Sequence, residues 1–293
     1  MLVPAINKII LGTAQFGLEY GINNTTGKPT QQAVNEILCK AYDAGIRCLD
    51  TAEAYGNAHE VIGRFHQDYP DRIFNVISKL PHDIDNNIRQ NIEKYLRQLN
   101  IDRLEALLFH SYQTYKAYKK AKVELHTYKN NNTVKYLGVS VYTNDQFADV
   151  IEDDEIDIVQ LPFNLFDNIN QRGALLAKAK QKNKIVHTRS VFLQGLFFSM
   201  ADDQSKIARS LSRELNYIKD LSHQSAISVQ KMALNYCLQN VDIDNVLIGV
   251  DNLDQLEQNL KDADNNLSAA LIDKINKIHI TDIDLLNPSL WRQ

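Results

Sequence analysis

The chain has 293 residues, of which 44% are hydrophobic, and 36 acidic against 32 basic residues give a formal charge of -4. This balance offers no basic surface for nucleic acid or an anionic membrane, and no apolar run approaches the roughly 20 residues of a membrane span. The three cysteines, Cys39, Cys48 and Cys237, lack C-x-x-C spacing, which argues against a disulfide framework or a zinc site. Without the basic and apolar segments of an export signal at the start, we expect a cytoplasmic protein.

Eight short apolar runs predict the strands of a sheet. Most of these runs are continuous rather than alternating, which is typical of parallel strands that are covered on both faces. In chain order, the predicted strands are Ile9–Leu11, Cys48–Leu49, Phe74–Ile77, Leu104–Phe109, Leu137–Val139, Ile156–Val159, Ile185–Val186 and Val246–Ile248.

Amphipathic stretches between these runs predict helices over residues 32–44, 85–99, 170–182, 206–221, 226–238 and 268–279. Strand–helix repetition favours an α/β protein, and eight units in under 300 residues fit a closed (β/α)8 TIM barrel, which needs ~250 residues. We expect residues 1–293 to form one barrel domain with a tail over about 281–293. A polar stretch around residues 201–206 is predicted to be a long loop at the active face. An open doubly wound sheet is the alternative, but no G-x-G-x-x-G motif follows the first strand.

Four polar residues stand at the end of an apolar run: Asp50, Lys79, His110 and Ser140. Their spacings of 29, 31 and 30 residues correspond to one strand–helix unit each. In a barrel these strand ends share one rim, which is where chemistry occurs in this fold. Charged groups at such a buried position must be paired or functional. Taken singly, the Asp50–Lys79 pair also fits a purely structural ion pair, and His110 a structural histidine.

Tyr55 lies five residues past Asp50, and the turn at Gly56 is expected to aim its side chain over the barrel. A tyrosine acid has a pKa of ~10, which must fall for work near neutrality. The Lys79 ammonium is expected to lower the pKa of Tyr55, and Asp50 to hold Lys79 charged. His110 is placed to donate a hydrogen bond to a carbonyl oxygen.

These motifs resemble the aldo-keto reductase superfamily, in the family order and from residue 8 to about 260. The resemblance implies a metal-free reductase with a nicotinamide cofactor, with Tyr55 as general acid, Asp50 and Lys79 tuning it and His110 orienting the carbonyl. It places Phe16, Tyr55 and His110 against the substrate. The matching segments are Leu11–Gly17, Asp50–Gly56, Ser78–Leu80, Leu108–Ser111, Gly138–Ser140, Val159–Gln160, Ser190–Leu196 and Gly249–Asn259.

The resemblance also implies a set of cofactor-binding residues. Ser140 and Gln160 match positions that hold the nicotinamide carboxamide, and Arg189 falls where many members stack an aromatic residue on the ring. A guanidinium also stacks, but its charge disfavours the oxidised, cationic ring. The implied set is Gly12, Thr13, Asp50, Ser140, Gln160, Arg189, Ser190, Gly195, Leu196, Gly249, Asp251, Gln255, Gln258 and Asn259.

The choice between NAD(H) and NADP(H) stays open at this point. Many family members carry Lys or Arg at the positions of Gly249 and Gln255 to pair with a 2′-phosphate, and here both are uncharged. Asp251 and Asp254 repel phosphate, which favours NAD, or weak NADP binding through backbone amides at the start of a helix. The family habit favours NADP.

The substrate is expected to be a small, polar carbonyl compound. The segments Gly17–Asn24 and Arg189–Gly195 resemble a branch of the family associated with sugar and polysaccharide metabolism, which suggests a keto- or aldo-sugar or a sugar nucleotide. Aromatic walls are expected from Phe16, Tyr20, Tyr112 and Trp291. The oligomeric state is left open.

Two other functions fit the same motifs. One is a regulatory subunit that senses nicotinamide nucleotides, although Tyr55, Lys79 and His110 are all intact. The other is a Schiff-base lyase or aldolase with Lys79 as nucleophile. A lysine beside a carboxylate should stay protonated, which argues against nucleophilic use of Lys79.

Overall fold

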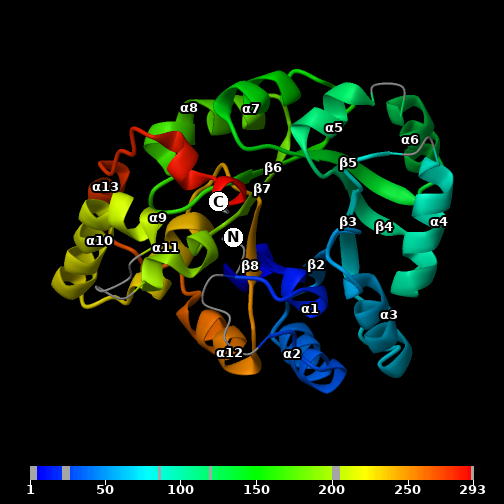
Figure 1. Ribbon diagram of the computed structural model, residues 1–293, viewed down its shortest axis with the longest axis horizontal. Helices are drawn as coiled ribbons and strands as arrows, with labels where there is room; N and C mark the ends of the chain where they lie inside the picture. The colour runs from blue at the N-terminus through cyan, green and yellow to red at the C-terminus, as the bar shows by residue number, and fades with distance from the viewer. Residues whose placement is uncertain (1–4, 22–26, 85–86, 119–120, 200–204, 292–293) are drawn as a thin grey trace.

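Eight parallel strands pair in sequence order and close into a barrel, because β1 also pairs with β8 (Figure 1). This computed structural model describes residues 5–21, 27–84, 87–118, 121–199 and 205–291. All eight predicted strands and the (β/α)8 fold are confirmed, and the open-sheet alternative is wrong. The strands are β1 (Ile9–Gly12), β2 (Cys48–Asp50), β3 (Asn75–Leu80), β4 (Leu104–Phe109), β5 (Val134–Ser140), β6 (Ile158–Pro162), β7 (Ile185–Arg189) and β8 (Asn245–Gly249).

Helices surround the barrel and connect the strands (Figure 1). Each of the six predicted helices is present, but the stretch 206–221 divides into α9 and α10. The helices are α1 (Ala14–Gly17), α2 (Gln31–Asp43), α3 (Ala58–Asp68), α4 (Ile88–Leu99), α5 (Tyr112–Ala117), α6 (Ala121–Asn130), α7 (Asn144–Val150), α8 (Ile169–Gln181), α9 (Lys206–Ser210), α10 (Ser212–Ser225), α11 (Val229–Leu238), α12 (Leu253–Asp262) and α13 (Ala269–Asn276).

The described residues also form four short 3-10 helices: η1 (Ala5–Lys8), η2 (Leu193–Phe198), η3 (Ile283–Leu286) and η4 (Pro288–Leu290). The last two, η3 and η4, lie at the mouth of the barrel, where Pro288 and Ser289 line the central cavity. Most of the loop expected around residues 201–206 lies outside the described residues. No helix in the described part of the chain is long and apolar enough to cross a membrane.

The barrel has two separate hydrophobic layers. The larger lies between the strands and the helices and includes the four buried residues of α2 that repeat at helical spacing, Val34, Ile37, Leu38 and Ala41. The smaller fills the barrel interior and consists of Ile10, Ile77, Ala106, Leu108, Ile158 and Leu247.

The inner hydrophobic layer determines which residues form the floor of the cavity above it. Successive side chains of a strand point to opposite faces, so residues two positions further along also point inward. Ile77 is thus followed by Lys79, Leu108 by His110 and Ile158 by Gln160, and all three later residues line the cavity. The strand pattern therefore brings apolar and polar residues into successive rings of the same interior.

Candidate active site

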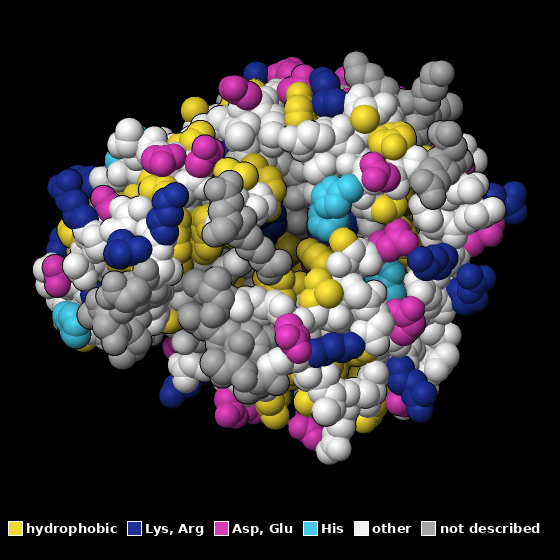
Figure 2. All heavy atoms as spheres, in the orientation of Figure 1, with side chains coloured by type: hydrophobic (Ala, Val, Ile, Leu, Met, Phe, Trp, Pro, Cys, Tyr) yellow, Lys and Arg dark blue, Asp and Glu magenta, His cyan; other side chains and the backbone are white. Residues whose placement is uncertain are grey.

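A cavity of about 690 Å³ opens at the carboxyl ends of the strands, and all eight strands or the residues directly after them contribute to its wall. Figure 2 shows the molecule hollowed at this point, with hydrophobic side chains inside and histidine at the edge. Its volume lies in the range of small-molecule sites, which are about 300–1,000 Å³. The barrel therefore presents one concave site where this fold carries its chemistry.

Most of the predicted site residues line this cavity. They are Gly12, Thr13, Asp50, Tyr55, Lys79, His110, Ser140, Gln160, Arg189, Ser190, Gly195, Gly249, Asp251, Gln255 and Asn259.

Three predicted site residues do not line the cavity. Phe16 and Leu196 are completely buried in the outer hydrophobic layer, and Gln258 is exposed on α12. Phe16 and Gln258 are each next to a lining residue, Gln15 and Asn259, on the same helix. Neighbouring helix positions differ by about 100° in direction, because a turn takes 3.6 residues, so a motif match one position off exchanges a wall residue for a core or surface residue.

Of the four aromatic residues expected in the walls, Tyr20 lines the cavity and Phe16, Tyr112 and Trp291 do not. The Tyr112 hydroxyl instead donates to Asp149 Oδ2 at 3.1 Å, and Trp291 Nε1 donates to the Leu285 carbonyl at 3.1 Å. The wall also contains residues that the sequence analysis did not assign. These are, among others, Gln15, Leu18, Tyr142, Phe198 and Gln230.

Asp50 and Lys79 form a buried ion pair at the floor of the cavity. Lys79 Nζ also donates to the Thr51 carbonyl at 3.0 Å, and Gln160 Nε2 donates to the second Asp50 carboxylate oxygen at 2.8 Å. Burial lowers the pKa of Lys79, but the Asp50 carboxylate and the Tyr55 phenol outweigh it and raise that pKa overall. Lys79 therefore carries a fixed positive charge, and both oxygens of its counterion are satisfied.

Tyr55 lies beside this pair and beside His110. Lys79 Nζ is 5.1 Å from the centre of the Tyr55 ring, and the Tyr55 and His110 rings meet edge to face at 5.8 Å. Desolvation raises the pKa of Tyr55, and the opposing effect of Lys79 does not cancel it. The expected net fall in this pKa is therefore wrong for the structure as it stands. At neutral pH the phenol keeps its proton and is in the acid form.

His110 faces the cavity as a neutral imidazole. Burial, with Lys79, His82 and Arg189 adding to it, lowers the pKa of His110 to about 3. Its buried Nδ1 has no hydrogen-bond partner in the described structure, and the ring stacks on His82 at 4.8 Å. A neutral imidazole has one N–H to donate, which suits it to a carbonyl oxygen.

The loop that carries Tyr55 is held from two sides. Gly56 adopts a positive φ of 57°, as its predicted turn requires, and lies against Gly17 at the end of α1. A Cβ at Gly17 would lie 1.7 Å from the Tyr55 carbonyl oxygen, so only glycine permits this approach. On the other side, Glu53 accepts hydrogen bonds from Lys94 at 2.8 Å and from the Tyr95 hydroxyl at 2.5 Å.

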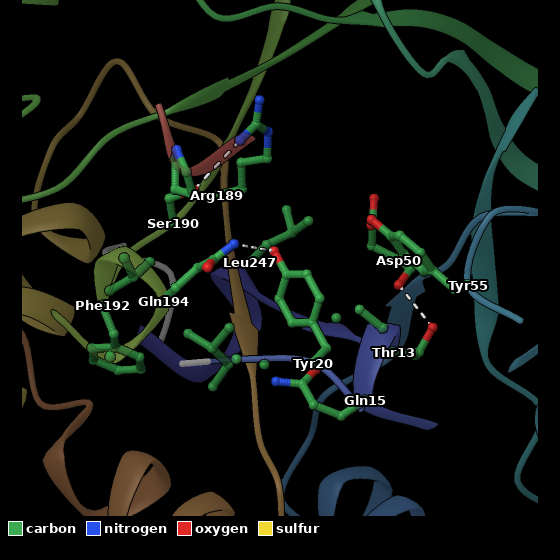
Figure 3. A pocket seen from close by; sticks show the side chains of 18 of the residues that line it. Thr13, Gln15, Tyr20, Asp50, Tyr55, Arg189, Ser190, Phe192, Gln194 and Leu247 are labelled. Atoms are coloured by element: carbon green, nitrogen blue, oxygen red, sulfur yellow. Dashed lines mark hydrogen bonds between the residues drawn. The ribbon is translucent and has the colours of Figure 1, made fainter. Parts of the chain in front are cut away.

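On the opposite side of the cavity, the loop after β7 has a strained backbone. Ser190, Leu193 and Gln194 have positive φ angles of 61°, 47° and 54°. Gln194 Nε2 donates to the Tyr20 hydroxyl at 2.9 Å, and Figure 3 shows the two side chains meeting end to end. The loop therefore reaches the segment that follows α1.

The start of α12 supplies an acidic group to the cavity wall. Gln255 folds back on Asp251, accepting from its backbone N–H at 2.8 Å and donating to its Oδ2 at 3.1 Å. The other carboxylate oxygen, Oδ1, is buried without a partner in the described structure. Among the described lining residues, the only Lys or Arg side chains are those of Lys79 and Arg189. No three His, Cys, Asp or Glu side chains in the described ranges gather to hold a metal ion.

Comparison with known families gives a match across nearly the whole barrel. The model of the aldo/keto reductase family matches residues 8–280. The chain belongs to the aldo/keto reductase family. The resemblance seen in the motifs is confirmed, and this aldo/keto reductase is an oxidoreductase that uses NADP(H) or NAD(H) for carbonyl chemistry.

Two curated proteins resemble this aldo/keto reductase over most of its length. D-arabinose 1-dehydrogenase of Saccharomyces cerevisiae is 24% identical over 264 residues, which cover 82% of this chain and 73% of the yeast protein. The uncharacterised oxidoreductase YqkF of Bacillus subtilis is 21% identical over 284 residues, covering 86% of this chain and 90% of the relative.

Solved structures show the same fold. The aldo-keto reductase AKR11C1 of Bacillus halodurans superposes with a TM-score of 0.72 at 16% identity, covering 92% of this chain and 91% of that one. A putative aldo-keto reductase from Pseudomonas aeruginosa gives a TM-score of 0.65 at 18% identity, covering 87% and 88% of the two chains.

Proposed function

We propose that this enzyme reduces the carbonyl group of a polar aldehyde or ketone to an alcohol, with Tyr55 as the proton donor. The observation that carries the proposal is the arrangement of Tyr55 between the Asp50–Lys79 ion pair and the neutral His110 on one rim. The nicotinamide cofactor supplies the hydride when it is bound.

The residues around the carbonyl have separate tasks in this mechanism. His110 donates its N–H to the carbonyl oxygen and fixes its position. As negative charge develops on that oxygen, Tyr55 transfers its hydroxyl proton to it, which completes the alcohol. The resulting phenolate lies beside the Lys79 ammonium, whose charge stabilises it. A proton from water then restores the phenol.

The wall from β5 to α12 offers groups that suit a nicotinamide nucleotide. Gln160 gives its N–H to Asp50, which leaves its amide oxygen to accept from a carboxamide, and the Ser140 hydroxyl lines the cavity beside it. The Asp251 carboxylate at the cavity wall carries a negative charge and is a poor neighbour for a 2′-phosphate. These groups support binding of the dinucleotide along the wall from β5 to α12, and they favour NAD(H).

A sugar or sugar nucleotide is the proposed class of substrate, in carbohydrate metabolism and in the cytoplasm. The name of the yeast relative, a D-arabinose dehydrogenase, supports a sugar, as do the polar groups on the cavity wall. A sugar dehydrogenase runs the same steps in reverse, with Tyr55 as the base.

The alternative with Lys79 as a Schiff-base nucleophile has a physical objection. A nucleophilic amine must be neutral, and Asp50 and the Thr51 carbonyl hold Lys79 as an ammonium whose pKa is raised. The alternative of a nucleotide-sensing subunit predicts the same cofactor binding but no turnover of a carbonyl substrate.

The decisive test is turnover of a carbonyl panel with NADH and NADPH by the wild type and by Tyr55→Phe. We expect the wild type to reduce polar aldehydes and the variant to lose about 100- to 10,000-fold in kcat, because only the proton donor is removed. Cofactor dissociation constants measured by calorimetry should stay within about threefold. Tyr236→Phe, which removes a buried phenol that bonds to Asn276 and does not line the cavity, is the matched control. A Tyr55→Phe enzyme of normal activity would refute the mechanism.

A further inference from the structure

Arg189, the last residue of β7, presents a fixed positive charge to the cavity. Its guanidinium stacks on the Tyr142 ring at 4.1 Å, and it donates to the Val141 carbonyl at 3.3 Å and to Ser190 Oγ at 3.4 Å. These contacts use two of the five N–H groups of the guanidinium and leave three for a ligand. The side chain is partly buried and lines the cavity.

No carboxylate of the described residues pairs with Arg189. Lys79, the other lining cation, is neutralised by Asp50. Asp167, which interacts electrostatically with Arg189, gives both carboxylate oxygens to Arg172 at 2.6 and 2.7 Å. A partly desolvated guanidinium without a counterion is costly, and an anionic ligand would remove that cost.

The position of Arg189 relative to the proton donor suggests what carries that anion. β7 lies four strands from β3 in the closed ring of eight, so Arg189 and Lys79 stand on opposite sides of the mouth. Figure 3 shows Arg189 across the cavity from Asp50 and Tyr55. The charge of Arg189 nevertheless acts on both Tyr55 and His110. A small molecule whose carbonyl lies at Tyr55 and His110 therefore extends towards Arg189.

We propose that Arg189 binds an anionic group of the substrate, a carboxylate or a phosphate, so that the enzyme selects carbonyl compounds that carry a negative charge. This inference rests on the proposed reductase function. A guanidinium offers paired N–H groups that match the oxygens of either anion.

Two matched pairs of substrates test the proposal. Succinic semialdehyde is compared with its methyl ester for the carboxylate, and the phosphate ester of D-glyceraldehyde with D-glyceraldehyde for the phosphate. We expect kcat/KM to favour at least one anionic member by about 10- to 100-fold, the size of a charge-assisted hydrogen bond. The pair with the larger ratio identifies the anion.

Three variants assign the preference to the guanidinium. Arg189→Gln should abolish the preference through KM, so that the ratio of kcat/KM between the anionic and the neutral member of a pair falls to about one, and Arg189→Lys should keep part of it. Arg64→Gln, on the exposed face of α3, is the matched control and should change nothing. A wild type that favours the neutral members, or an Arg189→Gln that slows both members equally while weakening NADH binding, would overturn the proposal and assign Arg189 to the cofactor.

Failure of the proposed function gives a different result, because then no member of either pair is reduced. Calorimetric titration of the cofactor-loaded protein with each member decides the inference in that case. Binding of an anionic member alone, lost in Arg189→Gln, supports it, and equal or no binding of both members contradicts it.

Discussion

The two sides of the cavity are built in opposite ways. From β2 to β4, Asp50 and Lys79 are buried and paired, and the loop of Tyr55 is packed against Gly17 and tied through Glu53. From β7 to α12, the backbone is strained at Ser190 and Gln194. Among the described residues, Arg189 has no carboxylate partner and Asp251 Oδ1 has no hydrogen-bond partner. One side is complete within the protein, and the other offers unused charges and hydrogen bonds to ligands.

Among the substitutions that test this contrast, Lys79→Met on the packed side should have the largest effect. Removal of one partner of a buried ion pair leaves Asp50 uncompensated, which should cost about 3–5 kcal/mol in the free energy of unfolding. Because Lys79 lowers the pKa of Tyr55, its loss should raise that pKa further and move the alkaline limb of the reduction to higher pH. Denaturant unfolding and a kcat–pH profile measure both effects. The double variant Asp50→Asn, Lys79→Met should regain stability but not rate, and an unchanged pH profile would argue against the role of Lys79.

The packed side also depends on the approach of α1 to the loop that carries Tyr55. Gly17→Ala places a methyl group against the Tyr55 carbonyl and should displace the phenol, which we expect to lower kcat by about 10- to 100-fold. The free energy of unfolding should fall by about 1–3 kcal/mol, as it does at other overpacked sites. Gly173→Ala on α8, where the new methyl meets only a flexible Ile169 side chain, is the control. Equal kcat for the two variants would show that the contact does not position Tyr55.

The side of the cavity from β7 to α12 should accept a change of cofactor. Gly249→Lys with Gln255→Arg adds cations beside Asp251 and should shift the ratio of kcat/KM towards NADPH by about tenfold or more. A side chain at residue 249 must displace Gln15, whose amide lies 2.7 Å from the position of the new Cβ. Gln258→Arg, on the exposed face of α12, should leave the ratio unchanged. No shift in the double variant would mean that this segment does not contact the adenosine end.

Acid should weaken both sides through buried neutral histidines. Burial lowers the pKa of His59 and of His187 to about 4 and that of His110 to about 3. Since the unfolded state has a histidine pKa near 6.5 and binds these protons first, stability is complete above about pH 6.5 and falls as the pH drops towards the folded values. At about pH 5 each histidine should cost on the order of 1–2 kcal/mol. Urea unfolding of the wild type and of His187→Gln at about pH 6.5 and about pH 5 measures this loss. If the free energy of unfolding falls equally for both proteins between these two pH values, the contribution of His187 is contradicted.

The sequence predicted the packed side almost completely. Apolar runs locate strand ends, and Asp50, Lys79, His110 and Ser140 follow them at one strand–helix spacing, so a closed barrel brings them together. It predicted the short helices poorly. The six predicted helix ranges do not include α1, α3, α5, α6, α7 or α12. For α1, α5 and α7 the reason is length, since they span four, six and seven residues, too few to establish a 3.6-residue period.

The side of the cavity from β7 to α12 was harder to predict, because its wall comes from loops and helix faces. Gln230 on α11 reaches the cavity only through the packing of that helix, where it donates to Asn259 at 2.8 Å, and no local pattern marks it. The net pKa of Tyr55 was also missed, because burial of the phenol is a property of the assembled site.

The alternation of side chains inside the barrel makes the active site sensitive to strand length. Lys79 faces the cavity, while the next residue, Leu80, belongs to the outer hydrophobic layer. A single inserted residue within β3 would slip its register against β4, rotate the ammonium outward among the helices and turn a leucine into the cavity. Insertions in the loops that follow the strands do not change this inward and outward alternation. The fold therefore accepts longer loops at the mouth of the barrel but not longer strands.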